Sequence, residues 1–187
     1  MIRLDDQERL SEQQLIEGCL RGDQAAQRAL YAQTVDPVYR LLLRMTQDPE
    51  TAADLTQDTY IRVFQNLDRF EGASSLSTWI YRIAVNEAQQ YFRRRKRHDE
   101  LLREELPRPA EAETGEQETT ALRMDVRAAL ERLPEEERTL IVLRYFEGLD
   151  YARIAEVVGK PAGTVASGLN RARRMLEAHL GTTDPPD

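Results

Sequence analysis

The stretch that most constrains the fold is a run of apolar residues at helical spacing that ends in consecutive cations. The apolar positions recur every three or four residues and share one stripe of a helix: Leu76, Trp79, Ile80, Ile83, Ala84 and Ala88. Three residues are candidate N-caps, because a serine hydroxyl accepts from the free amides of a first turn: Ser74, Ser75 and Ser77. The pattern predicts one helix that ends in Arg93, Arg94, Arg95, Lys96 and Arg97.

The opposite face of this helix leaves two interpretations open. It carries Thr78, Arg82, Asn86 and Gln90. Cations hold phosphates and amide side chains can read base edges, so one interpretation is a nucleic-acid interface. The other is a core helix with a solvated basic end. The stretch alone favours neither.

Composition favours an all-helical protein without a cofactor. The chain has 187 residues, enough for one domain or two small ones, and only 9 glycines. The single Cys19 lies on an apolar face, which indicates a core position, and the distant His98 and His179 suggest no metal site. No apolar run approaches the roughly 20 residues that span a bilayer, and the first ten residues do not resemble a signal peptide. We expect a cytoplasmic protein with no membrane insertion.

The net charge of −7 is concentrated in one segment. Residues 99–118 hold eight acids and two bases, so this segment alone carries −6 and leaves −1 for the rest. The segment lacks hydrophobic periodicity and contains Pro107, Pro109 and Gly115. We therefore predict a flexible acidic linker over residues 99–119, extended by like-charge repulsion.

Capping signals divide the part before the linker into helices that form one domain, residues 1–98. A capping box pairs Ser11 with Gln14, Asp23 is an N-cap, and Asp48 precedes a proline at a first helical position. Pro37 is expected to open a separate helix after Asp36, because proline fits best in a first turn.

The part after the linker, residues 120–181, has the punctuation of a helix-turn-helix. A short helix capped by Asp150 ends at Gly159, and a long helix follows from Pro161 to Leu180. The outward face of this last helix holds Thr164, Ser167, Asn170, Arg171 and Arg174. A four-helix bundle with a basic surface patch is the alternative. Residues 182–187 are predicted to be a disordered tail.

Four segments together resemble, in order and spacing, the extracytoplasmic-function (ECF) subfamily of bacterial RNA polymerase sigma factors. They are AADLTQDTYIRVFQNLDRF at 52–70, STWIYRIAVNEAQQYFRRRKR at 77–97, LPEEERTLIVLRYFEGLDYARIAEVVG at 133–159 and KPAGTVASGLNRARRML at 160–176. The resemblance covers about residues 10–180. It implies that the first domain is region 2, that the second is region 4, and that the chain is an alternative sigma factor. Such a protein binds core RNA polymerase, recognises promoter DNA and helps to melt it, and is not an enzyme.

The resemblance also implies which residues act. Core polymerase would dock through its β′ clamp helices on Asp54, Leu55, Gln57 and Asp58, beside an alanine, Ala53, where the family usually has an acid. The β flap would bind the second domain. The −10 element would be read by Phe70, Gly72, Ala73, Ser74, Ser75, Asn86, Arg93, Arg94, Arg95 and Arg97. An anti-sigma factor is a further expected partner.

The last helix would read the −35 element in the major groove, and here the chain departs from the family. The usual pattern is T-V-K/R-S-R-L, whereas this chain has Ala166 and Gly168 at the two basic positions. We expect two DNA-facing cations to be missing, −35 binding to be weakened, and Ala166→Lys with Gly168→Arg to restore it. The contact set that remains is Thr164, Ser167, Asn170, Arg171 and Arg174.

Two rival functions stay open on the sequence. One is a stand-alone helix-turn-helix transcription regulator, which would need neither the acids near Asp54 nor the loop at 70–77. The other is a protein-binding adaptor that has lost DNA reading. We also hypothesise that linker acids fold back on Arg93–Arg97 in the free protein; these acids are Glu111, Glu113, Glu116 and Glu118.

Overall fold

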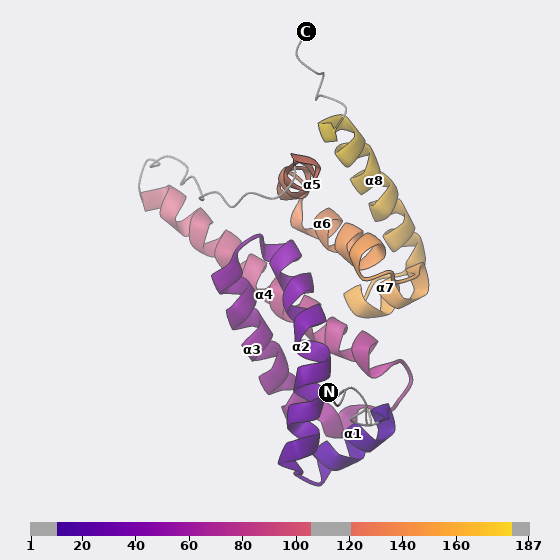
Figure 1. Ribbon diagram of the computed structural model, residues 1–187. Coiled ribbons are helices and arrows are strands. Elements are labelled where there is room, and N and C mark those ends of the chain that lie inside the picture. Colours follow the sequence, from indigo (N-terminus) through magenta and orange to yellow (C-terminus); the bar gives the residue numbers. More distant parts are fainter. Residues whose placement is uncertain (1–10, 106–120, 181–187) are drawn as a thin grey trace, which may run out of the picture.

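The computed structural model describes residues 11–105 and 121–180, and the regular structure in these ranges is entirely helical (Figure 1). The first range, called domain 1 below, holds α1 (Glu12–Leu20), α2 (Gln24–Thr46), α3 (Pro49–Asn66), the 3-10 turn η1 (Leu67–Arg69) and α4 (Leu76–Glu105). The second, domain 2, holds α5 (Ala121–Glu131), α6 (Glu135–Ile141), the π-helical η2 (Val142–Phe146), α7 (Tyr151–Val158) and α8 (Ala162–Leu180). The all-helical prediction is confirmed.

Side chains cap the helices at the predicted positions. The Ser11 hydroxyl accepts from the Gln14 amide at 3.3 Å, and the Gln14 side chain accepts from the Ser11 amide at 2.8 Å. Asp23, Asp48 and Asp150 each accept from an amide in the first turn of α2, α3 and α7. These bonds satisfy amides that a helix start leaves without an intrahelical partner, which is why the sequence located these starts.

Pro37 does not open a new helix, so that prediction was wrong. Helix α2 runs from Gln24 to Thr46 with Pro37 inside it. Proline has no N–H to donate, which costs helical stability. The helix continues because its apolar stripe packs against α3 and α4, where Leu30, Leu41 and Leu42 are completely buried.

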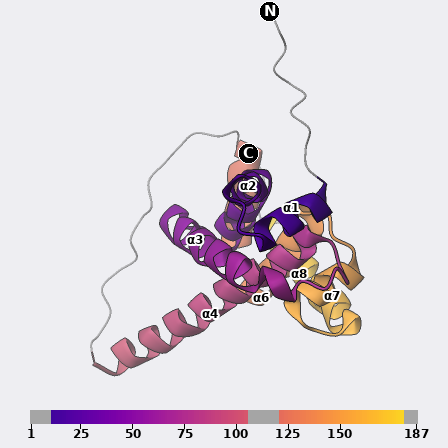
Figure 2. The same cartoon turned by 90° about the horizontal axis from the view of Figure 1, so that it is seen from below.

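Helix α4 is longer than predicted, because it continues to Glu105. The predicted linker therefore begins too early, and residues 99–105 belong to the helix. Arg95 and Asp99 lie one turn apart on it, with 4.0 Å between the guanidinium and the carboxylate. The rest of the linker, with the four acids proposed to fold back, and the tail 182–187 lie outside the described residues. In both views the C-terminal end of α4 projects away from the other helices (Figure 1, Figure 2).

The two domains pack against each other, which the sequence did not predict. Helix α4 contacts α7, and the end of α2 contacts α6 and η2. At this contact the largely buried carboxylate of Glu147 accepts from the Tyr81 hydroxyl at 2.7 Å and pairs with Arg44 at 3.5 Å. The Arg44 guanidinium also lies 4.6 Å from the centre of the Phe146 ring. Burial raises the pKa of Tyr81 well above its usual range, and the hydrogen bond to Glu147 raises it further, so the phenol stays a donor.

The contact around Glu147 yields a prediction about domain separation. Glu147→Ala would leave Arg44 and Tyr81 without their acceptor, at a cost of about 1–3 kcal/mol, so domain-separated conformers should become more populated. Single-molecule energy transfer between dyes on α1 and α8 would measure the separation. Glu156→Ala, at an exposed position on α7, is the control. Identical distance distributions for both variants would contradict the assigned role of Glu147.

Candidate nucleic-acid interface

The loop before α4 is shaped by its own packing. Phe70 packs against Trp79 with ring centroids 5.5 Å apart, and both side chains are half-buried. Gly72 has a φ of 71°, in the left-handed region that glycine adopts without strain. Ser75 is the N-cap, because its hydroxyl accepts from the Thr78 amide at 3.2 Å. Phe70 and Ser75 thus support the loop, while Gly72 and Ala73 present it to solvent.

Helix α4 presents a narrow polar face beside this loop. Asn86 is exposed, as predicted from the helical period. Its neighbour Glu87 is buried to 3% exposure and pairs with Arg62 of α3 at 2.6 Å. This pair was not predicted from the sequence, although a signal existed: Glu87 follows Ile80 and Ala84 at the spacing of the buried stripe. A charged residue at such a position indicates a partner on the neighbouring helix.

The cationic run is exposed along the second half of α4. All the arginines predicted to hold phosphates are exposed: Arg93, Arg94, Arg95 and Arg97. Arg95 and Lys96 also line a hollow of about 440 Å³ that includes Glu135 and Arg138 of domain 2. Burial lowers the pKa of Arg138, whose Nε has no hydrogen-bond partner. Part of the run therefore lies against domain 2.

The exposed side of α3 carries acids and apolar groups together. Asp54, Gln57 and Asp58 are exposed, whereas Leu55 is 3% exposed and packs in the core. Its expected part in a docking surface stays a prediction, whereas the three polar residues are accessible in this arrangement. Ile61, on the same helix, is 48% exposed. Two side chains near it, Tyr31 and Phe64, line a hollow of about 410 Å³ with Gln24, Gln27 and Arg28.

The outward face of α8 forms a second polar surface. The five predicted residues are all exposed, and Arg171 is in addition engaged by Glu137: Thr164, Ser167, Asn170, Arg171 and Arg174. A hollow of about 510 Å³ runs along this face. The Ser167 hydroxyl donates to the Thr164 carbonyl at 2.9 Å, which orients it along the helix.

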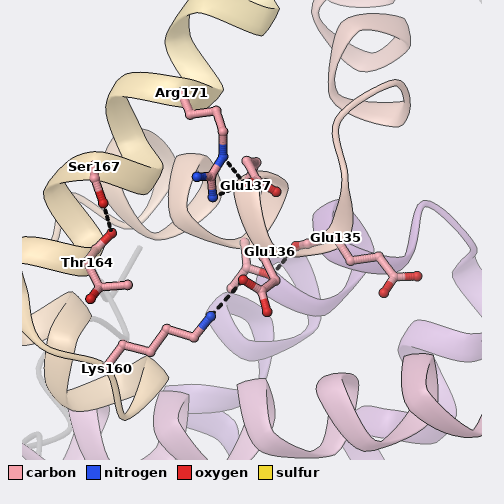
Figure 3. A network of polar contacts seen from close by, with 8 residues as sticks. Glu135, Glu136, Glu137, Lys160, Thr164, Ser167 and Arg171 are labelled. Carbon is pink, nitrogen blue, oxygen red and sulfur yellow. Dashed lines mark hydrogen bonds and ion pairs between the residues drawn. The ribbon is translucent and has the colours of Figure 1, made fainter.

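Acids in the first turn of α6 hold two cations from the neighbourhood of α8. Glu137 accepts from Arg171 Nε at 2.6 Å and also pairs with its Nη2, and Glu136 pairs with Lys160 at 2.7 Å. Figure 3 shows both contacts, and shows the side chain of Glu135 pointing away from them. A DNA-facing role was predicted for Arg171 from the sequence, which did not indicate an intramolecular partner.

Gly168 does not face solvent, which corrects the expectation of a missing DNA-facing cation there. It is buried, and a Cβ at this position would lie 2.5 Å from Cδ1 of Leu140 on α6. Position 168 belongs to the inward stripe with Val165 and Ala172, three residues before and four after it. Gly168→Arg would have to displace Leu140, so the double substitution is not expected to add a simple DNA contact. Ala166 is half-buried.

Within residues 11–105 and 121–180, no three acidic, histidine or cysteine side chains gather as a metal site would require. No helix in these ranges is long and apolar enough to cross a membrane. Cys19 is buried, and burial raises the pKa of its thiol. These features leave the two polar faces of α4 and α8 and the acidic face of α3 as the candidate sites.

The Glu87–Arg62 pair yields a stability prediction. Glu87→Ala should lower the free energy of unfolding by about 1–3 kcal/mol, because it removes a charge-assisted hydrogen bond that joins α3 to α4. For a chain of this size, this amounts to a melting temperature roughly 2–12 °C lower. The control is Asn86→Ala, at the exposed neighbouring position, which should change it little. Equal melting temperatures would show that the pair contributes nothing.

Comparison with known proteins follows the same division of the chain. A family model of sigma-70 region 2 matches residues 30–98, and one of sigma-70 region 4 matches residues 123–176. The ECF RNA polymerase sigma-E factor of Haemophilus influenzae is 34% identical over 181 residues, which cover 91% of this chain and 95% of that protein. The RNA polymerase sigma-H factor of Pseudomonas aeruginosa is also 34% identical, with 90% and 93% covered.

Two solved structures share the fold. The sigma factor RpoE from Bartonella quintana, in complex with the anti-sigma factor NepR, superimposes with a TM-score of 0.68 at 24% identity. The superposition covers 84% of this chain and 98% of the RpoE chain. CnrH, in complex with the cytosolic domain of CnrY, gives 0.67 at 24% identity, with 92% and 99% covered.

Proposed function

Because the chain belongs to the extracytoplasmic-function family of RNA polymerase sigma factors, we propose that α4 and its preceding loop read the −10 element and that α8 reads the −35 element. The protein is an alternative sigma factor, a transcription initiation factor. The observation that carries the proposal is that Asn86 and the arginines are exposed on one helix of domain 1, and that residues 72–73 are exposed in the loop before it. Catalysis belongs to the polymerase, so we propose no enzymatic activity.

The −10 surface suits a base that has left the stack of the opening duplex. Gly72 and Ala73 supply main-chain groups without bulk, and the Asn86 amide offers both a donor and an acceptor. The Phe70–Trp79 pair keeps this loop against α4, so these rings act by support. Arg93, Arg94 and Arg97 are available for phosphates, and each phosphate contact adds salt-dependent affinity.

The −35 surface is the outward face of α8. Ser167, Asn170 and Arg174 can reach base edges or phosphates when this helix lies in a major groove. The reassignment of Gly168 to the inward stripe removes one of the two substitutions that suggested a weakened reader. It thereby weakens the adaptor alternative as well.

The acidic face of α3 is the proposed dock for core polymerase. Asp54, Gln57 and Asp58 can pair with basic residues of the β′ clamp helices, and the exposed Ile61 adds apolar area beside them. We propose the β flap as the partner of domain 2. A stand-alone helix-turn-helix regulator would have no use for this face, which favours the sigma-factor role over that alternative.

A domain separation, one further partner and a location follow from this role. The two domains pack together here, whereas the −10 and −35 elements occupy separate stretches of a promoter, so we propose that polymerase binding separates the domains. An anti-sigma factor is a proposed partner, because both fold relatives were solved with one or with a partner's cytosolic domain. The site of action would be the cytoplasm, where the polymerase works.

Run-off transcription with core polymerase tests the −10 assignment. Asn86→Ala should lower promoter-specific transcription roughly 5- to 100-fold, as expected from the loss of one bidentate base contact. It should leave binding to core polymerase unchanged, since Asn86 lies outside the α3 face. The control is Gln13→Ala, the same kind of truncation at an exposed amide on α1. Unchanged start-site choice in the Asn86 variant would refute the assignment.

A binding titration tests the docking face. Asp58→Lys should weaken association of the labelled chain with core polymerase by at least about tenfold, because it places a cation opposite a basic partner. Asp68→Lys makes the same charge change at an exposed site on η1 and should have a smaller effect. If both reversals reduce affinity equally, net charge and not the α3 face governs docking.

A further inference from the structure

Glu137 is unlike its neighbours in the first turn of α6. Glu135 and Glu136 are exposed, whereas Glu137 is 6% exposed. A carboxylate removed from water is costly unless a cation compensates it. The cation here is Arg171, which donates from Nε at 2.6 Å and also pairs through Nη2.

Stability is one consequence of this pair. The Arg171 side chain is 61% exposed, so solvent screens part of the attraction. The geometry has a clearer consequence for the guanidinium itself. Glu137 engages one edge of the fork, formed by Nε and Nη2, which leaves the Nη1 end free to donate. Arg171 also lines the hollow along the outward face of α8, together with Ser167, Asn170 and Arg174.

A close approach of the two helices makes this arrangement possible. Leu140 follows Glu137 by three residues on α6, and Gly168 precedes Arg171 by three on α8. Because the Leu140 methyl fills the place of a Cβ at Gly168, the helices can lie near enough for a buried acid on one to reach an arginine on the other. Gly168, which was expected from the sequence to mark a lost DNA contact, is therefore the residue that lets α6 approach and support α8.

We infer that Glu137 is a positioning residue for promoter recognition, which holds the Arg171 guanidinium in a fixed orientation so that its free edge reads one position of the −35 element. This inference rests on the proposed function. A cation fixed before binding loses less conformational entropy when it forms a directional hydrogen bond. Arg174 lies on the same face and takes part in none of the ion pairs found among the described residues, so it suits the less directional task of phosphate contact.

The experiment compares the sequence preference of two isosteric variants in the holoenzyme. Full-length chain and core polymerase would be assembled, and open-complex formation measured on a cognate promoter and on promoters with every single substitution in the −35 element. Glu137→Gln should lower discrimination at one position, or two adjacent ones, by roughly 5- to 100-fold. The matched control is Glu135→Gln, the same charge change in the same turn, with a side chain that points away from α8 (Figure 3).

Electrostatics alone predicts a different result. If Glu137 were only an acid near DNA, its neutralisation would raise binding to every promoter by a similar factor and leave the preference profile unchanged. That outcome would overturn the inference. A loss of preference shared equally by the Glu135 variant would overturn it too, because it would assign the effect to the charge of the turn.

Arg171→Lys keeps the inference testable if Glu137→Gln is poorly folded. Lysine retains the charge at this exposed position but lacks the planar fork. It should lose discrimination at the same −35 position, and the double variant should lose no more than Arg171→Lys alone. Losses at different positions, or fully additive ones, would contradict the inference. A wild-type chain without any promoter preference would instead refute the proposed function, and the inference with it.

Discussion

The burial of the apolar stripe of α4 is the constraint on which the rest of the structure depends. Ile80, Ala84, Val85 and Ala88 are completely buried, so this part of α4 packs on α2 and α3 and meets α7 as well. A helix covered on these sides has only a narrow strip left for solvent. Asn86 lies on that strip, and the arginines continue it beyond the packed part of the helix. The proposed −10 surface is thus the part of α4 that stays exposed to solvent after the helix has packed.

The same helix packs against domain 2, and the proposed separation of the domains would break this contact. The contact includes Glu147, whose partners Arg44 and Tyr81 come from α2 and α4. Two members of the cationic run, Arg95 and Lys96, line a hollow together with the half-buried Arg138 of domain 2, whose buried Nε has no hydrogen-bond partner. A satisfied polar cluster and an unsatisfied polar atom therefore meet in the same contact between the domains. The unsatisfied atom lowers the cost of opening this contact, in keeping with the proposal that polymerase binding separates the domains.

Domain 2 shows how a short helix can prepare a longer one for binding. The first turn of α6 contributes two acids that hold Lys160 and Arg171, and Leu140 one turn later fills the space above Gly168. The first half of α8, the proposed −35 reader, is therefore supported by a neighbour that contributes no proposed DNA contact of its own. Proteins commonly fix binding side chains in this way, because an ordered side chain pays less entropy on association.

The sequence by itself determined the helix starts, the helical class and the polar faces. Capping bonds such as those of Ser11 and Asp48 join residues three positions apart, and the apolar residues of α4 recur in consecutive turns. Both features are local in sequence, so they can be predicted without knowledge of the tertiary structure. The inward orientation of Leu55 and Gly168 was also readable from spacing, had the period been followed at those positions. Only the tertiary structure decided that α2 continues through Pro37, that Glu147 joins the domains, and that Glu137 holds Arg171. The last two contacts join residues 66 and 34 positions apart, and they exist only because helices far apart in sequence are packed side by side.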